Sequence, residues 1–427
     1  MQTYIGRRSM TIKLPSILSV LLTALEYLWA VVVILDGNSV YHASTQTYYY
    51  LLESSVALTI LLLGAEVYLR RIPIRRNDVV VMAWMCIYCI VYLTVRQTQL
   101  AILTFTYLFV VGLPCLYLLF STLHRAGYLF PLIRRLFDVV VVLAVISLYY
   151  WVFGVMLQMF QPNMYITINW GSFSYAPGFD GLHFALQLDS TFFVDQGVIR
   201  NSGIFTEAPM FNLWLDLALA GELFLRNKPS KLRVGILTIT ILTTLSFTGI
   251  LFVVMCLVVY VVWNLHRMDR IVRGLFLGGL IVILPLIVGL AVHMLTIKSD
   301  TQSYTMRLSD YEAGFKLWLE YPVFGSGYGD LESLYPYIYS PDGVLGFSNT
   351  LTGVLGTGGL WISILFAIPH CGLLFTQLSG DRRISVFQFC YIYLICANAI
   401  FGRYLVVVMI AFGFAILLGP KDMRHKI

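Results

Sequence analysis

Residues 234–264 read VGILTITILTTLSFTGILFVVMCLVVYVVWN and contain no Asp, Glu, Lys or Arg. A helix that crosses a bilayer needs roughly 20 mostly apolar residues, so this run is long for a single span. Thr248-Gly249 near its centre is a turn signal. We therefore predict two short spans, 234–248 and 250–264, that share this turn, or alternatively one re-entrant hairpin.

The rest of the chain has the same character. Of its 427 residues 59% are hydrophobic and 12% charged, against about 25% charged in soluble domains. This composition excludes a soluble globular protein, and we predict an all-α, polytopic integral membrane helix bundle that forms one domain over 1–427. We expect twelve spans, or ten with a re-entrant hairpin: 14–35, 49–69, 79–95, 100–120, 137–160, 207–225, 234–248, 250–264, 274–296, 348–376, 384–400 and 404–420.

The distribution of lysine and arginine predicts the orientation. Of the 28 basic residues, 22 fall in segments on the side of the N-terminus, and cytoplasmic loops carry the excess of positive charge. We therefore expect both termini to be cytoplasmic. Twelve acidic residues make the external side net negative, so a basic residue is uncommon there. The external cations are Arg96, Arg200, Lys298, Arg307, Lys316 and Arg403.

Two external segments, 161–206 and 297–347, are long, whereas most other connections are short. Function is expected on such loops. In the second segment Leu308, Tyr311, Phe315 and Trp318 recur at helical spacing, which predicts an amphipathic helix that lies on the outer leaflet or caps the bundle.

A candidate anion site precedes the sixth span. Pro209 suits a first helical turn and Thr206 suits an N-cap, so free amides at the helix start, with Arg200 upstream, would favour an anionic group. The alternative is that Arg200 contacts lipid phosphates while Glu207 complements the helix dipole.

Arg307 is a second external cation. Two arginines from separate loops can hold a diphosphate by charge-assisted, bidentate bonds. The alternative for Arg307 is an i,i+3 pair with Asp310 on a solvated face, worth about 0.2 to 0.5 kcal/mol.

Two acidic residues fall near the middle of predicted spans. Glu26 and Asp216 would each cost about 2.5 to 3.5 kcal/mol at a span centre. These two acids are compatible with a proton-coupled transporter. The alternative is that each makes a structural hydrogen bond to a neighbouring helix. We expect no metal site, because no histidine pair has ligand spacing. All seven cysteines lie in apolar stretches and are expected to act as small hydrophobic residues.

Four stretches resemble the bacterial O-antigen and capsular polysaccharide polymerase and ligase superfamily, in that family's order. The resemblance covers roughly 195–365, whereas the first 190 residues match only as hydrophobic spans. The four stretches are Arg200-Asn-Ser-Gly-Ile-Phe-Thr-Glu-Ala-Pro; Leu245-Ser-Phe-Thr-Gly-Ile-Leu; Arg307 with Trp318, leading to Tyr321-Pro-Val-Phe-Gly-Ser-Gly-Tyr-Gly; and Ser348-Asn349 followed by Gly356-Thr-Gly-Gly-Leu.

The resemblance implies metal-independent glycosyl transfer, without a cofactor, at the outer face of the bacterial cytoplasmic (inner) membrane. Donor and acceptor would be glycans on undecaprenyl diphosphate, in contact with membrane lipids; a chain-length regulator protein is left open, and no nucleic acid is involved. Ser348 stands where the ligases, whose acceptor is a lipid A core, have a histidine. This departure favours a repeat-unit polymerase for O-antigen, capsule or exopolysaccharide, with a ligase or a flippase of the same lipid-linked glycan as alternatives.

The chemistry assigns roles to the predicted residues. Arg200 and Arg307 would hold the departing diphosphate, and Glu207 would take the acceptor proton or orient Arg200. The remaining residues would bind substrate: Ser348 and Asn349 by orienting sugar or phosphate oxygens, Trp318 and Tyr328 by stacking on a sugar ring, and Arg403 as a further external cation.

Overall fold

A computed structural model describes residues 16–419, apart from 45–47, 97–101, 171–172, 187, 190–197, 266–268, most of 272–301, 339–346 and 378–381. The predicted span 274–296 lies largely outside the described residues. The same holds for part of the predicted external segment 297–347, at 297–301 and 339–346.

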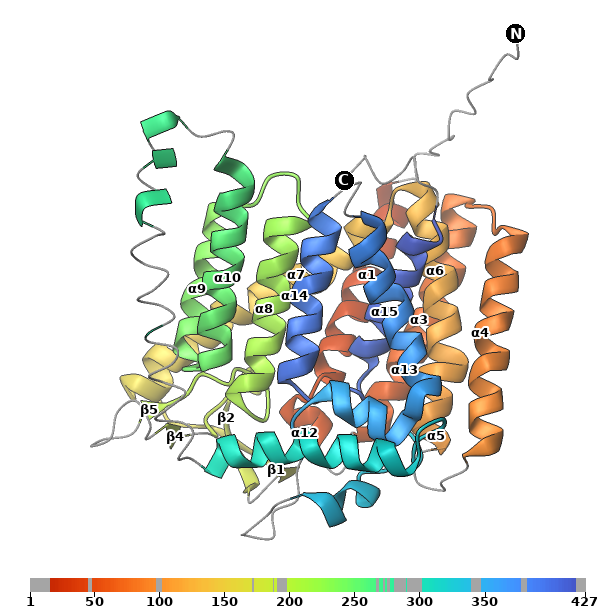
Figure 1. Cartoon of the computed structure of the whole chain (residues 1–427). Helices are drawn as coiled ribbons and strands as arrows, with labels where there is room; N and C mark the ends of the chain where they lie inside the picture. The colour runs from red at the N-terminus through yellow and green to blue at the C-terminus, as the bar shows by residue number, and fades with distance from the viewer. Residues whose placement is uncertain are drawn as a thin grey trace.

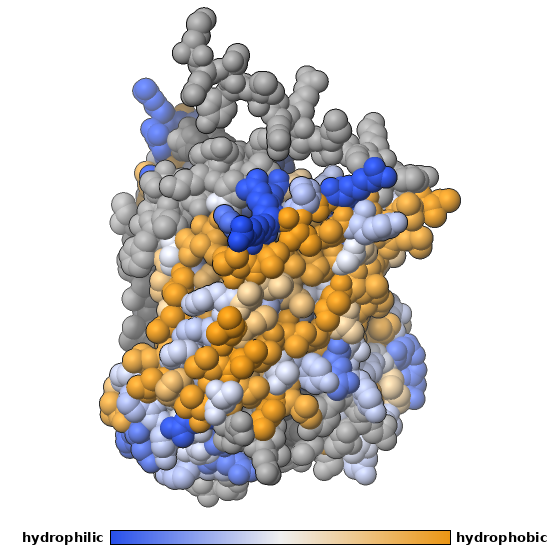
Figure 2. Space-filling model, turned by 90° about the vertical axis from the view of Figure 1, so that its right-hand side faces the viewer, coloured by the Kyte–Doolittle hydropathy of each residue, from blue (hydrophilic) through white to orange (hydrophobic). Residues whose placement is uncertain are grey.

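The chain folds into a bundle of helices that run between two ends (Figure 1). Seven helices of the described part are long and apolar enough to cross a membrane, which agrees with a polytopic membrane bundle. Figure 2 shows a broad hydrophobic band between hydrophilic residues at the two ends. The helices are α1 (Ser16–Asp36), α2 (Val40–Ala43), α3 (Tyr48–Arg70), α4 (Arg76–Val95), α5 (Ile102–Phe105), α6 (Leu113–Ala126), α7 (Leu129–Tyr149), α8 (Ala208–Phe224), α9 (Lys231–Thr243), α10 (Phe247–Asn264), α12 (Gln302–Glu320), α13 (Thr350–Gln377), α14 (Arg382–Ala397) and α15 (Tyr404–Leu417).

The two ends of the bundle differ in what they carry. The backbone N–H of Tyr404 donates to Asp36 Oδ2 at 2.7 Å, so the end of α1 meets the start of α15. We call this the loop end, because α2, α12 and the strands lie there (Figure 1). The opposite end, where α1 begins and α15 stops, is the termini end.

The charge-free stretch at 234–264 forms a hairpin, with a turn earlier than predicted. Helix α9 ends at Thr243 and α10 begins at Phe247, so the turn falls at Thr244–Ser246 instead of Thr248-Gly249. Gly249 lies in the first turn of α10, where a Cβ would come within 2.1 Å of Asn212 Oδ1. The glycine therefore allows close packing between helices and does not make the turn.

The first long loop contains a small sheet, which an all-α prediction omitted. Strands β1 (Met164–Trp170), β2 (Phe173–Phe179) and β3 (His183–Phe184) pair antiparallel in that order, with Met164 opposite Gly178 and Phe179 opposite His183. Strands β4 (Leu188–Asp189) and β5 (Val198–Ile199) form a second pair. Ile168, Ala176 and Phe184 pack with Val40 of α2, which fastens the sheet to the bundle.

Helix α12 is present as predicted, but a different face packs. Its buried residues are Asp310, Ala313 and Leu317, whereas Leu308 and Phe315 are exposed. Gly314 lies so close to α13 that a Cβ would be 2.6 Å from the Thr352 carbonyl oxygen. The small residues therefore face the bundle, and α12 lies across its loop end (Figure 1).

Helix α13 is broken at Gly359, whose φ is 61°. The glycine-rich loop that follows α12 inserts its backbone at this break. Ser326 N–H donates to Gly356 O at 3.2 Å and Gly327 N–H to Thr357 O at 2.9 Å, while Trp361 N–H donates to Val323 O at 2.9 Å. Free backbone groups within a bundle need such partners. The break thus holds the loop that follows α12 against α13.

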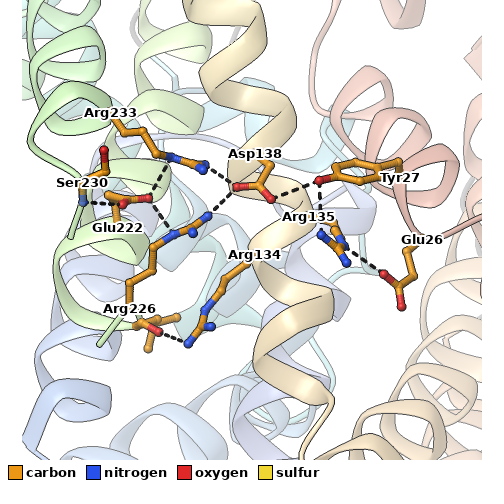
Figure 3. A network of polar contacts seen from close by, with 10 residues as sticks. Glu26, Tyr27, Arg134, Arg135, Asp138, Glu222, Arg226, Ser230 and Arg233 are labelled. Carbon is orange, nitrogen blue, oxygen red and sulfur yellow. Dashed lines mark hydrogen bonds and ion pairs between the residues drawn. The ribbon is translucent and has the colours of Figure 1, made fainter. Parts of the chain in front are cut away.

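The termini end is joined by a network of ion pairs (Figure 3). Glu222 Oε2 forms ion pairs with Arg226 Nε at 2.7 Å and with Arg233 Nε at 3.1 Å, and both arginines also pair with Asp138 of α7. On the other side of α7, Arg135 pairs with Glu26 at 2.9 Å. Since these residues come from α1, α7, α8 and α9, the network connects these helices.

Candidate functional site

Arg200 is held against the turn between α9 and α10. Its Nε donates to the Thr244 carbonyl oxygen at 2.8 Å. The next residue reinforces the attachment, because the Asn201 backbone N–H donates to Thr243 O at 3.1 Å and its Nδ2 to Thr243 Oγ1 at 2.9 Å. The segment before α8 is therefore fixed to the family-like motif that begins at Leu245.

The start of α8 is shifted by one residue from the predicted cap. Glu207 is the N-cap residue, its backbone carbonyl accepts from Met210 and Phe211, and Pro209 lies in the first turn. Thr206 instead donates through both its N–H and its Oγ1 to the Asn38 carbonyl, at 3.2 Å in each case. Thr206 thus ties this segment to the turn after α1, and Glu207 stands half-buried at the head of α8.

Arg307 lies on α12, within electrostatic range of α14. Its charge acts on Asp310, Tyr311 and Tyr393, and the Tyr393 hydroxyl donates to the Thr248 carbonyl at 3.2 Å. Arg307 is half-buried, and its guanidinium makes no hydrogen bond or ion pair with any residue that the structure describes. Arg200 thus contacts the Thr244 carbonyl directly, whereas Arg307 is related to the segment 244–248 through Tyr393, which donates to the Thr248 carbonyl.

Asp310 does not form the ion pair with Arg307 that the i,i+3 alternative required. Its Oδ2 accepts from the Ser348 N–H at 2.9 Å and from the Ser348 hydroxyl. Burial raises the pKa of Asp310 above its usual value, while the two Ser348 hydrogen bonds and the Arg307 charge oppose the shift. Because Asp310 is bound to Ser348, the Arg307 guanidinium has no carboxylate partner among the described residues.

The predicted substrate-binding residues around α13 have structural partners in this arrangement. Asn349 Oδ1 accepts from the Thr352 N–H at 2.9 Å and from its hydroxyl at 2.7 Å, which caps α13. Tyr328 is 3% exposed and its N–H donates to the Tyr92 hydroxyl at 2.8 Å, so little of its ring is open for stacking on a sugar. Trp318 is half-buried and donates to Pro322 O at 3.1 Å. Of the two aromatic residues, Trp318 has the more accessible ring.

Arg403 belongs to a separate cluster at the loop end. Its guanidinium contacts His42 Nε2, and His42 Nδ1 lies 3.5 Å from Asp36 Oδ1. Burial and the Arg403 charge lower the pKa of His42, with Asp36 opposing them. A neutral imidazole is the form that accepts from Arg403, so this cluster orients the arginine.

Part of the chain matches a known protein family. Residues 233–367 match the family model for O-antigen ligase. The predicted resemblance to the O-antigen polymerase and ligase superfamily is therefore confirmed over this segment. No curated protein and no solved structure matches the chain.

The O-antigen ligase segment contains most of the site. It spans α9, α10, α12 and the break in α13, so it includes the Thr244–Thr248 turn, Arg307 and Ser348. Arg200, Glu207 and Arg403 lie outside it. The family implies a membrane enzyme of the glycosyl-transfer type. Arg307 lies in the matched segment, and Arg200 lies outside it.

Sequence reasoning missed two polar residues that hydrogen-bond to Thr244 and Thr248. Tyr393 and Asn212 carry no motif, and each sits within an apolar helix where a polar side chain is uncommon. Their position inside apolar runs was the sequence signal that could have identified them, because polar groups inside membrane spans are costly unless they bind a partner. Within the described residues, no group of three or more His, Cys, Asp or Glu side chains is placed to hold a metal ion.

Proposed function

We propose that this protein is a polymerase that joins oligosaccharide repeat units carried on undecaprenyl diphosphate, at the outer face of the cytoplasmic membrane. The observation that carries the proposal is the placement of two cations beside the segment 244–248. Arg200 contacts the Thr244 carbonyl, and Arg307 lies within electrostatic range of Tyr393, whose hydroxyl donates to the Thr248 carbonyl. A diphosphate that leaves during glycosyl transfer gains negative charge, and guanidinium groups placed beforehand stabilise that charge.

In the proposed reaction a hydroxyl of the acceptor sugar attacks the anomeric carbon of the donor glycan. The bond from that carbon to the phosphate oxygen breaks, and undecaprenyl diphosphate departs with both electrons. Arg200 and Arg307 would bind its phosphate oxygens. Glu207, the N-cap residue of α8, would accept the hydroxyl proton.

Ser348 supports a polymerase over a ligase. The ligases resembled here have a histidine at this position, and in this chain the Ser348 hydroxyl donates to the buried carboxylate of Asp310. A ligase-type role for an imidazole has no counterpart at this residue. A lipid A core acceptor is accordingly the second choice.

Glu26 gives little support to the transporter alternative. This carboxylate pairs with Arg70 at 3.3 Å and with Arg135 at 2.9 Å, the second pair being drawn in Figure 3. These ion pairs join α1 to α3 and α7, which is a structural role. The structural alternative is the better interpretation of Glu26.

Gel analysis of surface glycan from a deletion strain separates the three activities. Single repeat units on the cell surface would indicate loss of a polymerase. Free lipid-linked polymer would indicate loss of a ligase, and accumulation inside the cell would indicate loss of a flippase. Complementation with the wild-type chain should restore long glycans, and complementation with Arg307→Ala should not.

The orientation is tested separately by cysteine labelling. A cysteine at Asp330, at the loop end, should react with an impermeant thiol reagent in intact cells or spheroplasts. A cysteine at Lys228, at the termini end, should react only after the membrane is permeabilised. The reverse pattern would place the site on the cytoplasmic side and contradict the proposal.

A further inference from the structure

Asp216 is a buried acid that pairs with no charged group among the described residues. It lies midway along α8 and is 0% exposed. Its Oδ2 accepts from Asn212 Nδ2 at 2.6 Å, and its Oδ1 has no hydrogen-bond partner in the described part of the chain. An acid kept at such a position in a membrane helix calls for a functional explanation.

The side chain that Asp216 binds leads directly to the turn that holds Arg200. Asn212 lies one helical turn closer to the loop end. Its Oδ1 is 3.3 Å from Thr244 Oγ1, which shares its proton between this oxygen and the Ile241 carbonyl at 2.7 Å. The Asn212 amide fills the space beside Gly249, which has no Cβ to exclude it. Thr244 in turn presents its backbone carbonyl to Arg200 Nε at 2.8 Å.

We propose that Asp216 is a positioning residue, which fixes Asn212 and thereby the Thr244 carbonyl that orients Arg200. The path is Asp216, Asn212, Thr244, Arg200, and every step is a hydrogen bond between residues from three separate segments. The inference rests on the proposed function, since it assigns Arg200 to the diphosphate. It deepens that function by naming the intramembrane residues that place the arginine.

This role requires a hydrogen-bond acceptor at position 216 but no negative charge. Asparagine keeps an oxygen that can accept from Asn212, and its NH₂ group replaces the oxygen that has no partner among the described residues. Leucine removes the acceptor and leaves Asn212 Nδ2 buried without one. A proton-carrying role would make the opposite demand, because only the carboxylate can take up a proton.

The test compares Asp216→Asn and Asp216→Leu in purified protein supplied with a lipid-linked repeat unit. We expect Asp216→Asn to polymerise within about threefold of wild type and Asp216→Leu to lose about tenfold or more. Thr244→Val is the second variant, since it removes only the hydroxyl and keeps the carbonyl that Arg200 uses. It should resemble Asp216→Leu even where the leucine variant is recovered in low amounts.

Gln388→Leu is the matched control. Gln388 is also fully buried in a membrane helix and binds a polar side chain, His370, at 2.8 Å, away from the turn. Its loss should leave the rate per folded molecule unchanged. A rate loss in the control as large as in Asp216→Leu would show a general effect of buried polar groups and overturn the proposal.

A double variant and a binding assay complete the test. Adding Arg200→Lys to Asp216→Leu should lower the polymerisation rate little further, because each change alone already misplaces the cation at position 200. Binding of undecaprenyl diphosphate should weaken in Asp216→Leu and Thr244→Val but not in Asp216→Asn. Asparagine as damaging as leucine would overturn positioning in favour of a charge-dependent role. A wild type that neither binds undecaprenyl diphosphate nor polymerises would overturn the proposed function itself, and this inference with it.

Discussion

The arginines at the two ends of the bundle contact different kinds of group. At the termini end Arg226 and Arg233 are bound to the carboxylates of Glu222 and Asp138. At the loop end Arg200 is oriented by a backbone carbonyl and Arg403 by an imidazole. The described contacts therefore differ in kind. At the termini end, carboxylates join neighbouring helices through arginine, whereas at the loop end neutral groups position the arginine side chains.

The largest expected effect tests the loop end directly. Arg200→Ala and Arg307→Ala should each reach the membrane at near wild-type levels and lose polymerisation by about 10²-fold to 10³-fold, the scale for one lost transition-state donor. Lysine should restore activity only partly, because it lacks the planar two-pronged contact with phosphate. Polymerisation per purified molecule is the measurement. Normal long glycan from both alanine variants would make these arginines ordinary headgroup contacts.

The matching test at the termini end should affect stability and leave catalysis intact. Glu222→Gln removes the charge shared by Arg226 and Arg233, and breaking a buried ion pair in this way costs about 3 kcal/mol. Thermal unfolding in detergent should occur at a lower temperature, while the rate per folded molecule should stay near wild type. A variant of normal stability with a lower rate would assign this network to the reaction.

A smaller effect concerns the sheet at the loop end. Burial lowers the pKa of His183 to about 3, and neither ring nitrogen has a hydrogen-bond partner in the described residues. The unfolded histidine protonates near pH 6.5 while the folded one stays neutral, so stability is full above that pH and falls as the pH decreases toward 3. At pH 5.5 the expected loss is about 1.4 kcal/mol.

His183→Phe should remove this dependence, because phenylalanine keeps the ring contacts with Tyr150 and Phe179 but cannot be protonated. Hydrogen exchange of the β2 and β3 amides, corrected for intrinsic rates at pH 7.5 and 5.5, is the measurement. Equal acceleration at low pH in both proteins would show that another group titrates in this region.

The smallest expected effect is that of chelation. If two arginines neutralise the diphosphate, polymerisation in EDTA should remain within about twofold of the untreated rate, because no bound cation contributes. Loss of activity that magnesium or manganese restores would contradict metal independence. Asp330 and Glu332 would then be the first candidates for substitution.

The sequence predicted the spans better than the loops. Apolar runs such as 250–264 lie close to the observed helices because burial in lipid requires both length and continuous hydrophobicity. The sheet was missed although β1 reads Met-Tyr-Ile-Thr-Ile-Asn-Trp, an alternation with β-branched residues that is typical of strands. A criterion of long apolar runs does not detect strands this short, in which polar residues alternate with apolar ones.

The site was predictable as residue types but not as an arrangement. External arginines and the family-like motifs identified Arg200 and Arg307, because each departs from the charge bias of its side. Ser348 binding to Asp310 and the burial of Tyr328 depend on how α12 packs against α13, which no local spacing encodes. Long-range packing decides which polar groups a substrate can reach.

The break in α13 has a consequence for how such proteins diversify. The loop after α12 is attached there by main-chain atoms, through Ser326, Gly327 and Trp361. Gly325 and Gly359 must lack a side chain there, since a Cβ would meet backbone atoms at 2.2 and 2.4 Å, and the buried ring of Tyr328 anchors the same loop. Substitutions at these three positions would displace the loop, whereas exposed side chains of α12 such as Phe315 can change without disturbing the attachment.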